Sequence, residues 1–174
     1  MKKTLFSVAI SLLFVACTDS AKTDNTASSD KTEMKALYEK NLASLKASLV
    51  AFEKEDIDTW ASYISDTAIW NSPAYGDTVN TKAHWKESLK GYLDNWDNLK
   101  LNNAIFLPGV DTATLSFDGS VRYYGSWDGV HISGVATKAN FYGAYNFNKD
   151  GKVIFGTDFF DLGGLLNALK PMSK

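Results

Sequence analysis

The sequence is poor in several residue types on which protein chemistry often depends. Its 174 residues include one cysteine, Cys17, one arginine, Arg122, and two histidines. One cysteine cannot form a disulfide within the chain, so packing must stabilise the fold. The histidines, at positions 84 and 131, do not have the close spacing of metal ligands. We therefore expect neither a metal site nor a cofactor.

The charges exclude a second group of functions. Lysine and arginine total 18 against 20 acidic residues, and the sequence has no basic cluster of the kind that binds nucleic acid. It also lacks a G-x-S-x-G motif and a glycine-rich phosphate loop between a strand and a helix. What the chain does have is 45% hydrophobic and 13% aromatic residues, which suffice for one domain with a substantial core.

The N-terminus has the pattern of an export signal. Residues 1–3 are short and basic, and the apolar run at residues 4–16 is too short to span a bilayer comfortably. The run ends in "FVAC", which resembles the lipobox of bacterial lipoproteins, although Phe14 stands where leucine is commoner. The resemblance implies cleavage after residue 16 and lipidation of Cys17, and several acyl chains give a lasting anchor. A plain signal peptide is the alternative.

A solvated segment follows the predicted lipidation site. Residues 18–31 contain no large apolar side chain, so we expect residues 17–31 to form the lipidated cysteine and a flexible tether. Thr18 rather than aspartate follows Cys17, which, by resemblance to enterobacterial sorting, favours the outer membrane. The expected location is the cell envelope, lipid-anchored at the outer membrane and facing the periplasm, with a folded domain at residues 32–174.

Three helices are predicted at the start of this domain. Apolar residues from Tyr38 to Phe52 recur at spacings of three and four, which predicts a helix over residues 33–54. Asp30 is its expected cap, and Asp56 is the expected N-cap of a second, short helix. A short strand that ends before Pro73 separates this helix from a third one at residues 81–96.

The rest of the chain has the pattern of β-strands. Strands are predicted at residues 99–107, 112–127, 135–147 and 152–160, with a bulge or kink at Asp118–Gly119 and a tight turn at Asp150–Gly151. Asp161 is expected to cap a short C-terminal helix. This order predicts an α+β fold, in which a curved, mainly antiparallel sheet wraps over three N-terminal helices.

Two stretches resemble the nuclear transport factor 2-like superfamily, in particular its SnoaL-like members. Residues 49–73, "LVAFEKEDIDTWASYISDTAIWNSP", are similar to the family's helix, acidic turn, short helix and first strand. Residues 143–166, "GAYNFNKDGKVIFGTDFFDLGGLL", are similar to its closing hairpin and terminal helix. The resemblance covers roughly residues 33–170. It implies a cone, in which a strongly bent mixed sheet closes over helices and leaves a mostly apolar pocket at the open end.

The catalytic residues of the family match only in part. The positions of the ketosteroid isomerase's oxyanion tyrosine, general base and second aspartate hold Ser48, Ser72 and Gly143. Ketosteroid isomerase chemistry is therefore not expected. SnoaL-type cyclases carry a catalytic aspartate on the last strand, and Asp158 falls close to that position. The histidine that assists it has no counterpart in "ANFYGAYNF".

Asp158 is the candidate catalytic residue because a carboxylate among aromatic residues is costly unless something satisfies it. Strand alternation places it opposite Gly143, with Tyr145 on the same face, and Gly143 and Gly156 are expected to leave space for a ligand. Burial would raise its pKa, and Tyr145 or Tyr123 would orient it or bond a substrate carbonyl. The alternatives are a permanently satisfied structural carboxylate and a surface residue.

The same alternation predicts which side chains line the pocket. On the strand at 112–127, the face with Tyr123 and Trp127 is the more apolar and is expected to point inward, with Tyr124 outward. Trp60, Trp85 and Trp96 lie on helix stripes and are expected in the core. The predicted ligand-binding residues are Trp70, Ser72, Tyr123, Trp127, Phe141 and Phe160.

Three functions remain open from the sequence. The first is a lipid-anchored protein that binds a small, mainly apolar or carbonyl-containing molecule. The second is an acid/base enzyme of the cyclase, isomerase or dehydratase type that uses Asp158. The third is a non-catalytic dimerisation or protein-interaction module that uses the outer face of the sheet.

Overall fold

The computed structural model describes residues 23–170, so the predicted signal peptide and Cys17 lie outside the described residues. Two helices open the described chain, α1 (Thr23–Glu53) and α2 (Ile57–Ser62). The later elements are β1 (Ile64–Asn71), α3 (Lys82–Asn95), β2 (Trp96–Val110), β3 (Phe117–His131), β4 (Ala136–Phe147), β5 (Val153–Phe159) and α4 (Leu162–Ala168).

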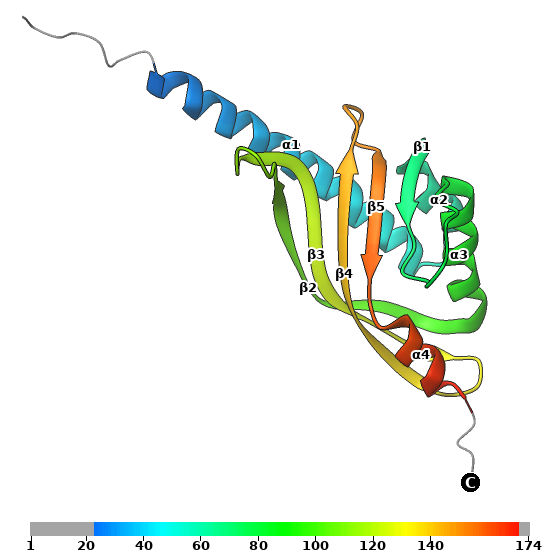
Figure 1. Cartoon of the computed structure of the whole chain (residues 1–174). Coiled ribbons are helices and arrows are strands. Elements are labelled where there is room, and N and C mark those ends of the chain that lie inside the picture. Colours follow the sequence, from blue (N-terminus) through cyan, green and yellow to red (C-terminus); the bar gives the residue numbers. More distant parts are fainter. Residues whose placement is uncertain (1–22, 171–174) are drawn as a thin grey trace, which may run out of the picture.

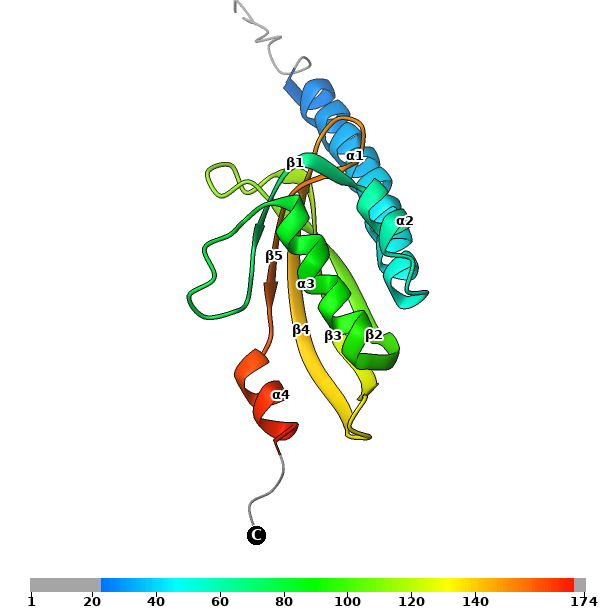
Figure 2. The same cartoon turned by 90° about the vertical axis from the view of Figure 1, so that its right-hand side faces the viewer.

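The five strands form one curved, mixed sheet in the order β1-β5-β4-β3-β2 (Figure 1). β1 runs parallel to β5, and the other neighbours are antiparallel. The helices α1, α2 and α3 cover one face of this sheet, and α4 lies beyond the end of β5 (Figure 2). The predicted α+β architecture is therefore confirmed: a cone-like curved sheet over three N-terminal helices, plus a short C-terminal helix.

Local turn and cap chemistry follows the sequence closely. The Asp56 side chain accepts a hydrogen bond from the Thr59 N–H at 2.9 Å, and Asp161 accepts one from the Gly164 N–H at 2.7 Å. Both predicted N-caps are thus confirmed. The hairpin between β4 and β5 turns through Gly151, whose φ is +81°. Its register places Gly143 opposite Asp158 as predicted, although the pairing shifts between Asn146 and Phe147 next to the loop.

The core lies between the helices and the face of the sheet that they cover. On β3, Val121 and Tyr123 are 0% and 1% exposed. Tyr124, which follows Tyr123 and points to the other face of the strand, is 48% exposed. The predicted inward face of this strand is therefore confirmed. Phe52 of α1 and Trp85 of α3 pack against it within the same buried cluster. Burying each such large side chain contributes about 1.5–3 kcal/mol.

Several element boundaries differ from the prediction. α1 begins at Thr23 rather than Glu33, so its first turns overlap the segment predicted to be a tether. Residues 18–53 contain neither glycine nor proline, which leaves a helix free to propagate toward the N-terminus. β2 continues through Pro108 to Val110, whereas the prediction ended this strand before Pro108. It is an edge strand, where a missing N–H need not break a ladder.

The start of β3 also differs. Residues 111–116 form a turn, in which the Asp111 N–H bonds the Ser116 carbonyl at 2.9 Å, and the strand begins only at Phe117. The predicted bulge at Asp118–Gly119 is confirmed, because the pairing shifts there and Gly119 has a φ of +77°.

Candidate ligand-binding site

A cavity of about 110 Å³ lies between the helices and the covered face of the sheet. Every helix and strand of the described chain contributes to its wall, which is mainly aromatic and aliphatic. Among the described residues that line it, Asp158 is the only one with an acidic or basic side chain. The cavity therefore combines apolar walls with one charged group, a combination typical of ligand pockets.

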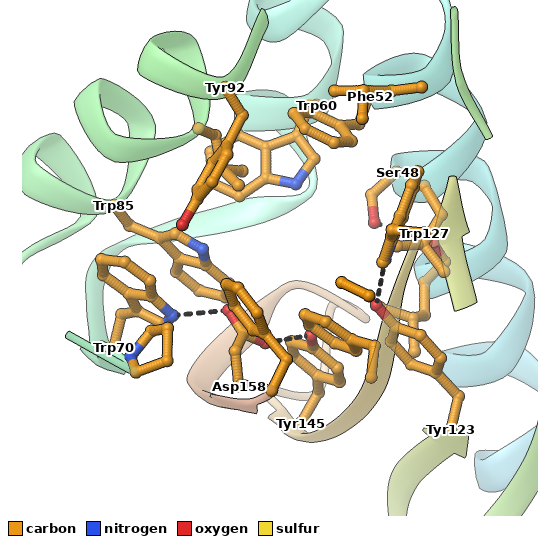
Figure 3. A pocket seen from close by; sticks show the side chains of 18 of the residues that line it. Ser48, Phe52, Trp60, Trp70, Trp85, Tyr92, Tyr123, Trp127, Tyr145 and Asp158 are labelled. Atoms are coloured by element: carbon orange, nitrogen blue, oxygen red, sulfur yellow. Dashed lines mark hydrogen bonds between the residues drawn. The ribbon is translucent and has the colours of Figure 1, made fainter. Parts of the chain in front are cut away.

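Asp158 is buried, with 6% of its surface exposed, and has a hydrogen-bond donor on each oxygen. The indole N–H of Trp70 donates to Oδ2 at 2.8 Å, and the hydroxyl of Tyr145 donates to Oδ1 at 2.5 Å (Figure 3). An ionised carboxylate can accept about four hydrogen bonds, so two acceptor positions are left after these two donors.

The register of the sheet places these three residues together. β5 lies between β1 and β4. Trp70 of β1 pairs with Gly156, two positions before Asp158, so its indole reaches along β5 to the carboxylate. Tyr145 of β4 pairs with the same glycine from the other side. The two donors to Asp158 thus come from the two neighbouring strands.

Burial shifts the pKa values of the ionisable groups in this cavity upward. Desolvation raises the pKa of Asp158 to about 6, although the bonds from Tyr145 and Trp70 oppose the shift. Desolvation and the nearby Asp158 charge raise the pKa of Tyr92 to about 12, and the pKa values of Tyr123 and Tyr145 rise further. At neutral pH the tyrosines are therefore neutral, and Asp158 is mostly ionised but close to its titration range.

Stacked aromatic rings form one wall of the cavity. The rings of Trp70 and Trp85 are parallel, with centroids 5.6 Å apart, and the Tyr145 ring stacks on Trp85 with a centroid distance of 6.2 Å. Tyr123 stacks on Tyr145 at 5.9 Å and on Phe141 at 5.3 Å. This ladder joins β1, α3, β4 and β3, and it presents aromatic surface along the cavity beside Asp158.

The two glycines next to Asp158 do not leave the open space that we expected. A Cβ atom on Gly143 would lie 2.6 Å from the Tyr145 hydroxyl, and one on Gly156 would overlap the Trp85 ring. The room at both positions is filled by these rings. The glycines instead allow Trp85 and Tyr145 to lie close against the sheet, and the cavity lies beyond them.

Most of the predicted pocket residues line the cavity. They are Asp158, Tyr145, Trp70, Tyr123, Trp127, Phe141 and Phe160. Ser72 does not line it: β1 ends at Asn71, so strand alternation no longer applies, and the Ser72 hydroxyl accepts the Ala74 N–H at 3.1 Å. The structure thus brings together seven of the eight residues, while their catalytic and binding roles stay predictions.

Sequence reasoning missed Tyr92 as a polar group of the cavity. Its hydroxyl points toward the interior from α3, and no described residue forms a hydrogen bond with it (Figure 3). Tyr92 lies in the helix predicted at residues 81–96, and a helical pattern does not reveal whether a helix meets side chains or a cavity. The same holds for Trp60, Trp85 and Trp96, which are buried as predicted and also line the cavity.

The described residues contain no cluster of three or more histidine, cysteine or acidic side chains that could hold a metal ion. His84 bonds Asp77 at 2.7 Å, and His131 bonds Ser133 at 2.8 Å. In the same part of the chain, no helix is long and apolar enough to cross a bilayer.

Comparison with known proteins identifies the fold. No family model matches the sequence, and no curated protein matches it either. Solved structures do match. They include a provisionally assigned isomerase from Bacillus subtilis, at 16% identity and a TM-score of 0.63, over 76% of this chain and 96% of that one. A provisionally assigned polyketide cyclase from Xanthomonas campestris matches at 14% identity and a TM-score of 0.62, over 76% and 98%.

A third structure carries a ligand in its description. It is a protein of ketosteroid isomerase-like fold from Catenulispora acidiphila in complex with trimethylamine, at 10% identity and a TM-score of 0.58, over 72% of this chain and 90% of that one. At such low identities these matches show the fold alone. The chain has the nuclear transport factor 2-like fold, whose structural neighbours include cyclase-like and ketosteroid isomerase-like proteins.

Proposed function

We propose that the protein binds a small, mainly apolar molecule in this cavity and is anchored to the cell envelope by lipid at Cys17. The observation that carries the binding function is the aromatic-walled cavity with Asp158 fixed between Trp70 and Tyr145. Such a group orients a ligand, while the walls provide most of the contact area.

The size of the cavity limits the ligand. An apolar cavity of roughly 150 Å³ in another protein holds one benzene ring. At about 110 Å³, this cavity suits a molecule about the size of one small ring rather than a steroid. The trimethylamine bound by the structural neighbour from Catenulispora acidiphila is a molecule of this size class. Asp158 and the free Tyr92 hydroxyl provide the polar contacts.

The test is mass spectrometry of small molecules released from the purified full-length protein. Ala139→Phe adds a ring to the cavity wall, whereas Ala136→Phe adds the same ring at an exposed position of the same strand. We expect wild type and Ala136→Phe to release a molecule that Ala139→Phe does not retain. Equal release from all three proteins would locate the molecule elsewhere, and no release from wild type would argue against the binding function.

An acid/base enzyme is a second candidate, and the titration of Asp158 favours it. A carboxyl group with a pKa of about 6 can both donate and accept a proton near neutrality. Asp158→Asn separates the two functions once the retained molecule is known. Binding without product formation in the variant would support catalysis, whereas product formation at the wild-type rate would exclude Asp158 as its catalyst.

The outer face of the sheet favours a role in association. A cross-strand row of Ile105, Tyr124, Tyr142 and Phe159 runs over it, and Tyr124 and Phe159 are 48% and 56% exposed. Exposed apolar groups gathered in this way mark interaction surfaces. If this row forms a homodimer, Tyr124→Lys should convert a sedimenting dimer into a monomer. A wild-type monomer would reject this use of the row.

A further inference from the structure

The charge on Asp158 has no counter-ion within the described chain. None of the ion pairs among residues 32–170 includes it, and both of its hydrogen bonds come from neutral groups, Trp70 and Tyr145. The nearest histidine in the aromatic cluster, His84, contacts the Trp70 ring, but its Nε2 is already bonded to Asp77 at 2.7 Å. Burying a carboxylate without a cationic partner costs free energy, and a positively charged ligand would offset that cost.

The walls of the cavity favour the same sign of charge. Tryptophan, tyrosine and phenylalanine rings carry a negative electrostatic potential on their faces and attract cations. Trp60 and Trp127 line the cavity outside the stacked ladder, in which Trp70, Trp85 and Tyr145 partly cover one another's faces. The lining tyrosines stay neutral. No lysine, arginine or histidine is among the described lining residues, so an anionic ligand would find no cationic partner there and would be repelled by the Asp158 carboxylate.

The mainly apolar lining selects among cations. A primary ammonium group has three N–H donors that need acceptors. Besides Asp158, the only described lining residues with a side-chain oxygen are Ser48, Thr137 and the tyrosines, and the rest of the wall is apolar. Methyl groups remove these donors and place apolar surface against the aromatic walls. The cation that fits is therefore methylated.

We infer that the ligand is a small methylated ammonium ion, whose charge pairs with Asp158 while its methyl groups contact the surrounding aromatic rings. This inference rests on the ligand-binding function proposed above, and it names the chemical class of the ligand. The charge and the aromatic walls act together. The carboxylate provides the counter-ion, and the rings provide a surface that attracts a cation and displaces its water.

The test compares three probes of related shape by isothermal titration calorimetry on the full-length protein. Choline carries a trimethylammonium group, dimethylbutanol has the same shape with a neutral carbon in place of the nitrogen, and ethanolamine lacks the methyl groups. We expect choline to bind at least about tenfold more tightly than either of the others. Equal binding of choline and dimethylbutanol would overturn the requirement for charge, and equal binding of choline and ethanolamine would overturn the requirement for methyl groups.

Two variants assign the effect to Asp158. Asp158→Asn should weaken choline binding about tenfold and leave dimethylbutanol binding unchanged. Asp150→Asn removes an exposed carboxylate from the hairpin loop and should change neither. A variant at position 158 that binds choline as wild type does would overturn the role of Asp158. If Asp158→Asn does not fold, the comparison of probes on the wild-type protein still decides the question.

The outcomes separate this inference from the binding function itself. If dimethylbutanol binds as well as choline, or if mass spectrometry finds a retained neutral molecule and choline does not bind, the cation is wrong and the binding function holds. If no probe binds and no molecule is retained by wild type, both proposals fail.

Discussion

The indole N–H of Trp70 and the carboxylate of Asp158 lie 2.8 Å apart, although 88 residues separate them in the sequence. The bond crosses between β1 and β5, which are the only parallel pair of the described sheet. It therefore links the strand that lies among the helices to the last strand of the sheet. Because the bond is buried and ends on a charge, its loss should affect both the titration of Asp158 and the stability of the fold.

The first prediction concerns this bond. Trp70→Phe keeps the aromatic ring but removes the donor, so the pKa of Asp158 should rise above its present value of about 6. The free energy of unfolding should fall by about 1–3 kcal/mol, because a buried acceptor loses its partner. NMR titration of the carboxyl carbon measures the pKa, and urea denaturation measures the stability.

Trp60→Phe is the matched control for this bond. Trp60 is 4% exposed and lines the same cavity, but it forms no hydrogen bond with Asp158 in the described structure. It should lower stability through lost packing without shifting the Asp158 titration. A Trp70→Phe protein with an unchanged pKa at Asp158 would show that this hydrogen bond does not form in solution.

The second prediction is a pH dependence of stability. The pKa of Asp158 is raised from 3.8 to about 6 in the folded protein, so between these values the folded state holds a proton that the unfolded chain releases. The contribution of Asp158 to stability is therefore present at low pH and is lost as the pH rises through about 6, by roughly 3 kcal/mol in total. The groups that face it, Tyr92, Tyr123 and Tyr145, stay neutral throughout this range.

Asp158→Asn should remove this slope. Denaturation of both proteins at several pH values from about 4 to 7 gives the difference in their free energies of unfolding, in which carboxylates shared by the two proteins cancel. We expect the variant to gain stability relative to wild type as the pH rises. A difference that is constant over this range would mean that Asp158 titrates at its ordinary value and is not desolvated.

The third prediction tests the proposed anchor. Cys17→Ser removes the thiol that the lipobox resemblance assigns to lipidation, so the protein should move from the membrane fraction to the supernatant after cell fractionation. Ser20→Ala, three positions further along, should leave the protein in the membrane fraction. If Cys17→Ser remains bound to the membrane, the lipoprotein hypothesis is wrong.

The sequence predicts most of the fold because many of its determinants are local. Asp56 and Asp161 act on N–H groups three residues away, and the β4–β5 hairpin turns at Gly151, whose φ is positive. Strand alternation then places Asp158 opposite Gly143 and points Tyr123 inward. In each case a few neighbouring residues determine the geometry, so the pattern can be recognised in the sequence alone.

The details of the cavity depend on contacts between distant segments, which no local pattern specifies. Whether the space at Gly156 stays open depends on Trp85, which α3 brings from 71 positions earlier in the chain. Likewise, the hydroxyl of Tyr92 faces the cavity because α3 packs over the covered face of the sheet (Figure 3). The structure does not place Ser72 in the cavity for a different reason: β1 ends at Asn71, and strand alternation does not extend beyond the end of the strand.

The last prediction uses the glycines that this packing explains. Gly156→Ala places a methyl group against the Trp85 ring, which can move only into the cavity that it lines. We expect a loss of about 1–3 kcal/mol in the free energy of unfolding, as for other overpacked cores, and weaker ligand binding.

Gly91→Ala is the matched control, because it adds the same methyl group on α3, where nothing lies within 4 Å. There the better helix propensity of alanine should stabilise the protein by up to about 1 kcal/mol. Chemical denaturation of both variants measures the contrast. A neutral or stabilising Gly156→Ala would show that Trp85 does not lie against β5 and that the cavity wall has a different arrangement.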